Sequence, residues 1–163
     1  MFKHPAALVL IASLTVVFST AAQEPSCTLR FDGAFRTDSG VEPVTQTGVR
    51  LTSGRDDDAA ECVKGAVLTY PADGLFNPVR GTLDLWIRPN WDSATPSGDR
   101  FFWGLDSDPG TGNRTVLGFL SRDGKGTLYF GGDGALGGLA ARVDWRAGEW
   151  HRVTVCWDDE TPC

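Results

Sequence analysis

The sequence predicts an all-β protein built as an antiparallel β-sandwich of two sheets. Nine short segments favour extended structure, and glycines, of which the chain has 20 in 163 residues, supply the turns between them. In the segment 81–88, Leu83, Leu85 and Ile87 alternate with more polar residues, which is the period of two that gives a strand two different faces. The segment 149–157 alternates in the same way. No window of helical periodicity and adequate length occurs beyond the N-terminal segment, apart from a turn at 56–62, so we expect little helix.

The chain begins with the pattern of a secretory signal peptide. Lys3 precedes the apolar run 5–18, and small residues lead to the cleavage site expected after Ala22. The apolar run is shorter than the roughly 20 residues that a membrane-spanning helix needs. We therefore predict a signal peptide at 1–22, no membrane span, and one domain at 23–163 that is secreted or held at the cell surface or in the periplasm.

The predicted domain contains all nine extended segments. Each combines β-branched or aromatic residues with turn residues at its ends. The segments expected as strands are 29–35, 49–51, 66–70, 81–88, 100–105, 115–121, 127–130, 139–143 and 149–157. An Asp-Gly pair at 123–124 favours a tight hairpin between the sixth and seventh of them.

The four cysteines, Cys27, Cys62, Cys156 and Cys163, all follow the predicted signal peptide. An even number of cysteines in an exported chain favours disulfide bonds, and four cysteines can pair in three ways. The sequence does not select a pairing, and one bridge with two free thiols stays open as an alternative. No Cys-x-x-Cys pair occurs, so a structural zinc site has no support.

Charge and residue spacing disfavour two classes of function. The chain has a formal net charge of −6, and nucleic acids are bound by basic surfaces, so we expect no nucleic-acid partner. A retaining glycosidase needs two carboxylates about 5 to 5.5 Å apart, whereas the acidic clusters at 56–58 and 158–160 are consecutive residues that would point to opposite faces of a strand. His151 has no Ser or Cys partner at a recognisable spacing.

Four segments together resemble laminin G-like domains. They are Leu-Arg-Phe-Asp-Gly at 29–33, a Tyr-Pro-containing segment at 65–74, Leu-Trp-Ile-Arg-Pro-Asn-Trp-Asp within 81–92, and Gly-Glu-Trp-His-x-Val-x-x-x-Trp-Asp at 148–158. The resemblance covers residues 29–158 and implies the concanavalin A-like jelly roll. Members of that family continue with further strands after the last motif. Because this sequence stops at Cys163, we expect the domain to be incomplete at its C-terminus; the alternative is a domain that closes with fewer strands.

Carbohydrate binding is the chemistry that the tryptophan-bearing strands fit best. Aromatic rings stack on the C–H faces of pyranose rings, and planar polar side chains bind paired hydroxyls. The candidate carbohydrate-binding residues are Asp84, Trp86, Arg88, Trp150 and Arg152. They would share one surface if the two strands lie in one sheet. The alternative is that both tryptophans only pack within the fold.

A glycine-rich loop is the candidate metal site. Calcium is the usual metal of the family that the chain resembles, and it takes oxygen ligands. Asp106, Asp108 and Asn113 could supply them, although their spacing fits no EF-hand. A solvent-facing turn is the alternative, and calcium is the only cofactor expected.

We expect a recognition module that binds carbohydrate or an extracellular matrix glycan, rather than an enzyme. Two alternatives stay open. One is a glycoside hydrolase or lyase whose carboxylates lie in the missing C-terminal strands. The other is a structural or adhesive module that binds protein. The fold cannot choose among them, because one fold hosts many functions.

Overall fold

The computed structural model describes residues 9–17, 27–72, 77, 79–95, 98–106, 114–120, 126–132 and 138–158. For 9–17, Asp106 and Arg114 it describes the backbone alone. Within these ranges the chain is all-β: strands account for its regular secondary structure, no helix occurs, and the paired strands are antiparallel. The all-β prediction is confirmed. In the same ranges no helix is long and apolar enough to cross a membrane.

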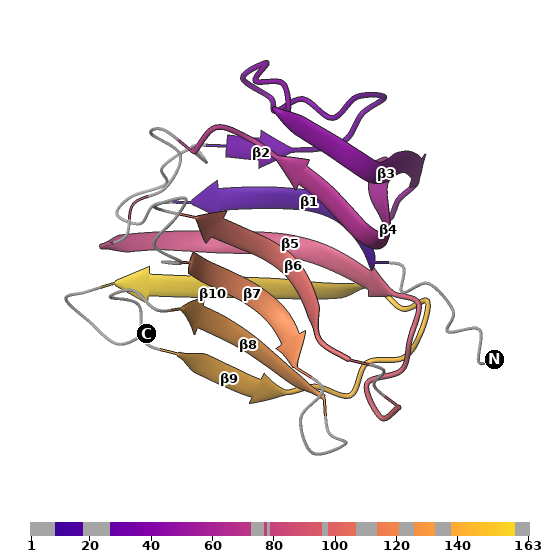
Figure 1. Ribbon diagram of the computed structural model, residues 1–163, viewed down its shortest axis with the longest axis vertical. Coiled ribbons are helices and arrows are strands. Elements are labelled where there is room, and N and C mark those ends of the chain that lie inside the picture. The colour runs from indigo at the N-terminus through magenta and orange to yellow at the C-terminus, as the bar shows by residue number, and fades with distance from the viewer. Residues whose placement is uncertain are drawn as a thin grey trace. The chain divides into compact units, whose positions relative to one another are not determined.

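The described strands form two sheets, which lie in two compact units (Figure 1). The first sheet has the order β10-β5-β1-β4-β3, and β2 also pairs with β1. Its strands are β1 (Val9–Val17), β2 (Cys27–Leu29), β3 (Thr45–Ser53), β4 (Asp58–Thr69), β5 (Arg80–Pro89) and β10 (His151–Asp158). The second sheet has the order β6-β7-β8-β9. Its strands are β6 (Arg100–Asp106), β7 (Arg114–Leu120), β8 (Thr127–Gly132) and β9 (Leu139–Arg142).

Strand β1 lies in the middle of the first sheet, between β5 and β4 (Figure 1). Its C-terminal half pairs with β5 on one side and with β2 on the other, and its N-terminal half pairs with β5 and β4. The sequence analysis assigned this segment to a signal peptide. A short run of mostly apolar residues, here interrupted by Ser13 and Thr15, is typical of a leader and also of a β-strand. Cleavage after Ala22 stays a prediction, and a chain cleaved there would lack β1.

Strands β5 and β10 show the predicted alternation clearly. Leu83, Leu85 and Ile87 of β5 are at most 1% exposed. Val155 of β10 pairs with Leu83, and Val153 pairs with Leu85, and both valines are buried. Full burial of one such side chain contributes roughly 1.5 to 3 kcal/mol. These two strands therefore share one apolar face and present their remaining residues on the other.

A second apolar cluster lies where β2, β3 and β4 meet. Leu29, Phe31 and Ala60 are buried there. Phe31 has a φ of 60°, a left-handed conformation that costs a residue other than glycine roughly 1 to 2 kcal/mol. The Tyr70 hydroxyl donates a hydrogen bond of 2.5 Å to the carbonyl oxygen of Phe35, so the turn after β2 is tied to the end of β4.

The second unit is organised around the buried residues of β7 and β8. Phe119 is fully buried, and the ring of Trp91 lies 4.3 Å from it, centroid to centroid. The Ser93 N–H donates to the carbonyl oxygen of Trp145 at 2.8 Å, and the Trp145 N–H donates to Ser93 Oγ at 2.8 Å. These bonds hold the segment before β6 against the segment after β9. A Cβ on Gly126 would lie 2.4 Å from the Phe119 ring, so this position needs glycine.

The nine predicted strand segments all overlap observed strands, but two boundaries were misjudged. The predicted strand 29–35 is strand only at Leu29, because the chain turns at Phe31. The turn expected at 56–62 is mostly the beginning of β4, which starts at Asp58. The Asp-Gly pair of the predicted hairpin lies outside the described residues, while β7 and β8 on either side of it are antiparallel neighbours, as expected.

The structure corrects the disulfide prediction for the three cysteines that it describes. Cys27, Cys62 and Cys156 are free thiols, and Cys163 lies outside the described residues. Cys156 lies on β10, three strands away from β2 and β4. With strands about 4.8 Å apart, that separation exceeds the roughly 4.4 to 6.8 Å between the Cα atoms of a disulfide. Cys27 and Cys62 are kept apart because they pair with opposite ends of β1.

We expect thiol reactivity to follow burial. Burial, with a smaller effect of the Glu61 charge, raises the pKa of the Cys62 thiol to about 11. Burial and the charge of Asp38 also raise the pKa of Cys27. In a Cys163→Ser variant at pH 8, iodoacetamide should therefore alkylate exposed Cys156, and should reach the other two thiols only in denaturant. Mass spectrometry of the alkylated peptides checks this, and rapid labelling of Cys62 in the folded chain would contradict it.

We also expect the first sheet to depend on β1. A chain that starts at Gln23 should lose hydrogen-exchange protection of the β5 amides, because β5 then keeps only β10 as a neighbour. In the full chain, Leu14→Pro should lower the thermal midpoint, because Leu14 pairs with Leu29 on one side and Leu85 on the other, and proline cannot donate to a ladder. Equal protection of β5 in the full and shortened chains would show that another segment takes this position.

Candidate functional site

The register of β5 and β10 brings most of the predicted carbohydrate-binding residues onto one face. Asp84 pairs with Thr154, and Trp86 pairs with Arg152. Their neighbours along β5 are the buried leucines, so these side chains lie on the opposite side of the sheet. We call this surface the polar face; it consists of Thr82, Asp84, Trp86, Arg88, Arg152, Thr154 and Cys156. Trp150, the fifth predicted residue, comes directly before β10.

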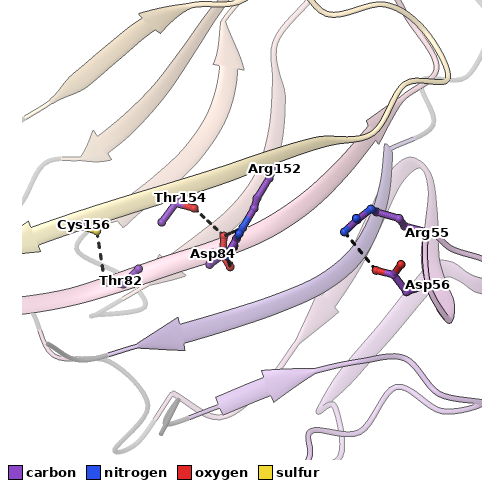
Figure 2. Close-up of polar contacts among 7 residues, drawn as sticks. All are labelled: Arg55, Asp56, Thr82, Asp84, Arg152, Thr154 and Cys156. Atoms are coloured by element: carbon purple, nitrogen blue, oxygen red, sulfur yellow. Dashed lines mark hydrogen bonds and ion pairs between the residues drawn. The ribbon is translucent and has the colours of Figure 1, made fainter. Parts of the chain in front are cut away.

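Asp84 is the centre of the hydrogen bonding on the polar face. Figure 2 shows its carboxylate between two side chains of β10. Arg152 donates from Nε to Oδ1 at 3.0 Å and from Nη2 to Oδ2 at 2.8 Å, so the two side chains form a bidentate ion pair. The Thr154 hydroxyl donates to Oδ1 at 2.7 Å. Asp84 therefore accepts bonds on both oxygens, and its main effect is to fix the plane of the Arg152 guanidinium.

The same contacts set the charge state of Asp84. Burial alone would raise the pKa of this carboxyl, but the hydrogen bonds from Arg152 and Thr154 and the positive charge of Arg152 outweigh it, so the pKa lies below its ordinary value. The Arg152 side chain is 58% exposed. A fixed, exposed guanidinium can donate its outer N–H groups to a ligand.

The two predicted tryptophans are packed as well as presented to solvent. Trp86 and Trp150 are half-buried, and both pack against Ala59 of β4. The Cζ atom of Arg55 lies 3.9 Å from the centroid of Trp86, and Cζ of Arg88 lies 5.0 Å from that of Trp150. Such cation–π pairs are worth about 0.5 to 1 kcal/mol at exposed sites. A ligand that stacks on these rings has to share them with guanidinium groups.

The polar face continues across β1 onto β4 and β3. Arg50 of β3 forms an ion pair with Glu61 of β4. The hydrogen bond from Arg50, and then the charges of Arg50 and Arg88, hold the pKa of Glu61 below its ordinary value despite an opposing effect of burial. Arg55, beside Trp86, contacts Asp56 at 3.3 Å (Figure 2). An arginine therefore lies beside each tryptophan, with acidic side chains close to both arginines.

Sequence analysis did not anticipate Arg50, Arg55 or Glu61. Residues 56–62 were expected to form a turn, so the alternation of β4 was not used. If β4 is extended to Asp58, Ala59 and Glu61 fall on one face of it. The alternation of residues 58–61 was therefore the sequence signal that could have placed Glu61 on the polar face.

His151 lies at the edge of this region and belongs to the apolar side of the sheet. It pairs with buried Ile87 and is partly buried. Burial lowers the pKa of its imidazole, with the charge of Glu149 acting in the opposite direction. The ring is therefore neutral near pH 7, which agrees with a packing role.

The predicted calcium site falls largely outside the described residues. Asp108 and Asn113 are not described, and only the backbone of Asp106, at the end of β6, is known. In the part of the chain that the structure describes, no group of three His, Cys, Asp or Glu side chains could hold a metal ion. Calcium binding at 106–113 stays a prediction.

Comparison with known proteins identifies no relative: no family model, no curated protein and no solved structure matches this chain. The resemblance to laminin G-like domains therefore stays a prediction, and the function has to be argued from the described residues.

We expect acid to destabilise the protein in two steps. Asp84, Glu61 and His151 all have lowered pKa values in the folded chain, so the unfolded chain binds more protons and stability falls as the pH falls. The histidine step begins near its ordinary pKa of 6.5, and the carboxylate steps begin near 3.8 for Asp84 and 4.5 for Glu61. Thermal midpoints between pH 8 and pH 3 measure both.

Substitutions assign these steps. His151→Gln should remove the decline that begins below pH 6.5 and leave the carboxylate step in place. Asp84→Asn should lower stability at pH 7 by about 1 kcal/mol or less, because its partner is well exposed, and should weaken the lower step. A midpoint that does not change between pH 7 and pH 5 in the unsubstituted chain would contradict the assignment to His151.

Proposed function

We propose that this chain is a recognition module that binds carbohydrate, or the glycans of an extracellular matrix, through the polar face of β5 and β10. The observation that carries the proposal is the register that gathers Asp84, Trp86, Arg88 and Arg152 on one surface, with Trp150 beside it. Aromatic rings next to planar donors are the combination that sugar recognition uses.

The arginines are the expected donors. Arg152 is held in one plane by Asp84, so less side-chain entropy is lost when it binds a ligand. Arg88 lies over Trp150 and can donate two parallel N–H groups to adjacent hydroxyls, or to a carboxylate of an acidic sugar. We expect stacking on Trp86 to displace Arg55, whose ion pair with Asp56 is exposed and weak.

The proposed architecture is a concanavalin A-like sandwich, as the laminin G-like resemblance implies. Its support is that each sheet has one apolar face. Leu83 and Leu85 are buried in the first sheet, and Leu117 and Phe119 are buried in the second. Two such faces are what a sheet-on-sheet core requires.

Binding is favoured over catalysis by the state of the carboxylates. A general acid needs a raised pKa. Asp84 and Glu61, the acidic side chains of the first sheet that lie beside the tryptophans, both have lowered pKa values and both form ion pairs with arginine. Neither suits proton donation to a leaving group.

We expect a glycan array probed with the full chain to give saccharide hits, and calorimetry with the best hit to measure its affinity. Arg88→Ala should weaken binding at least tenfold, which is about 1.4 kcal/mol. Arg88→Lys keeps the charge but loses the planar fork, so it should recover little of the loss. Trp86→Ala should also weaken binding. Arg30→Ala, at an exposed position in the same unit, is the control and should bind normally.

Two results would contradict the proposal. One is the absence of any glycan hit. The other is binding to matrix proteins that survives enzymatic removal of their glycans and is unchanged in Trp86→Ala, which would favour a protein-binding adhesive module.

A further inference from the structure

The second sheet carries a row of uncharged residues on the side opposite its buried core. Phe101 of β6 pairs with Gly118 of β7, Gly118 pairs with Tyr129 of β8, and Tyr129 pairs with Ala140 of β9. Paired residues point to the same side of a sheet. The residues of β7 and β8 that flank this row include the buried core positions, which point to the other side. The row therefore places two aromatic side chains on one face with a glycine between them.

The ring of Phe101 lies over Gly118. A Cβ atom on Gly118 would be 3.0 Å from Cδ1 of Phe101 and 2.7 Å from the carbonyl oxygen of Arg100. The ring thus occupies the space that a side chain at 118 would fill. Phe101 is nevertheless 65% exposed, so much of the ring is open to solvent.

The ring of Tyr129 also lies against glycines. A Cβ atom on Gly131 would be 2.8 Å from its hydroxyl oxygen, and a Cβ atom on Gly138 would be 3.1 Å from Cε2. Tyr129 is partly buried. Glycines on three different segments therefore allow both aromatic side chains to lie down along the sheet instead of standing up from it.

We propose that Phe101 and Tyr129 form a stacking platform for a neutral, extended β-linked oligosaccharide, separate from the polar face. The two residues stand on strands separated by one strand, about 10 Å apart at their backbones, and the Phe101 ring covers Gly118 on the strand between them. Pyranose rings in such a chain present C–H faces, which pack on aromatic rings.

Charge and size select this occupant. Phe101, Gly118, Tyr129 and Ala140 carry no charge, and Arg142 lies on the same face but beyond the row, so the row itself favours a neutral ligand. A stable protein interface buries about 800 Å² on each partner with a well-packed apolar core, whereas this row offers two rings among glycine and alanine. A sugar chain needs only the rings. The proposal does not rest on the polar face and holds even if that face binds nothing.

The test uses the full chain and cellohexaose, with affinity measured by calorimetry. Phe101→Leu keeps apolar cover over Gly118 but removes the ring, so we expect binding to weaken at least tenfold with the thermal midpoint little changed. Tyr129→Phe keeps the ring and should bind normally, whereas Tyr129→Leu should weaken binding. Leu139→Ala, at an exposed apolar position on neighbouring β9, is the matched control and should bind as the unsubstituted chain does.

The outcomes separate this platform from the polar face. The platform is supported if cellohexaose binds the Arg88→Ala variant but not the Phe101→Leu variant. This result would not depend on whether the polar face binds a glycan. Equal binding by Phe101→Leu and the unsubstituted chain overturns the platform, and so does the absence of cellohexaose binding. Self-association that is abolished by Phe101→Leu, without any binding of cellohexaose, would show that the rings serve contact between copies and would also overturn it.

Discussion

The first sheet depends on the position of β1, because this strand connects two halves that do not pair with each other. Both β4 and β5 are antiparallel to β1, so they run parallel to one another, and the backbone of each pairs with β1 rather than with the other. Glu61 and Arg88 both pair in register with Leu10. The strand therefore sets the spacing between the Arg50–Glu61 pair on one side and the arginine–tryptophan pairs on the other. The register of β1 therefore determines both the backbone hydrogen bonds of the sheet and the spacing of the charged side chains on its surface.

On the polar face, the groups that order the surface are also those that would meet a ligand. Asp84 uses both oxygens to hold β10 side chains, and the guanidinium groups of Arg55 and Arg88 cover tryptophan rings. Such contacts reduce the number of rotamers that the free protein explores, which lowers the entropic cost of recognition. They also compete with the ligand. The two effects differ between residues of the face. Asp84 orients the Arg152 guanidinium and leaves it exposed, whereas Arg55 lies over the ring of Trp86 and would compete with a ligand for it.

Sequence reasoning succeeded where it used the alternation of polar and apolar side chains, and failed where another sequence signal took precedence. The alternation of 81–88 and 149–157 was enough to place β5 and β10 and to bring Asp84 and Arg152 together. β1 contains two polar residues, Ser13 and Thr15, in a run that is otherwise apolar, and a run of this kind near the start of a chain also fits a signal peptide. Arg55 and Glu61 were missed because acidic residues at the start of β4 were read as a turn. The disulfide prediction failed for a different reason: cysteine counting has no access to strand order, and strand order separates the three described thiols.

The first sheet would come apart in an unusual way, because β1 lies at its centre rather than at its edge. Most sheets expose unpaired backbone groups at their outer strands, where short length, charge or proline limits contact with other chains. Here the departure of β1 would open two inner borders, one of them β5, whose Leu83, Leu85 and Ile87 are at most 1% exposed. Such a gap is complementary to any antiparallel apolar strand. The characteristic fault of this fold would then be domain swapping, in which one molecule completes another.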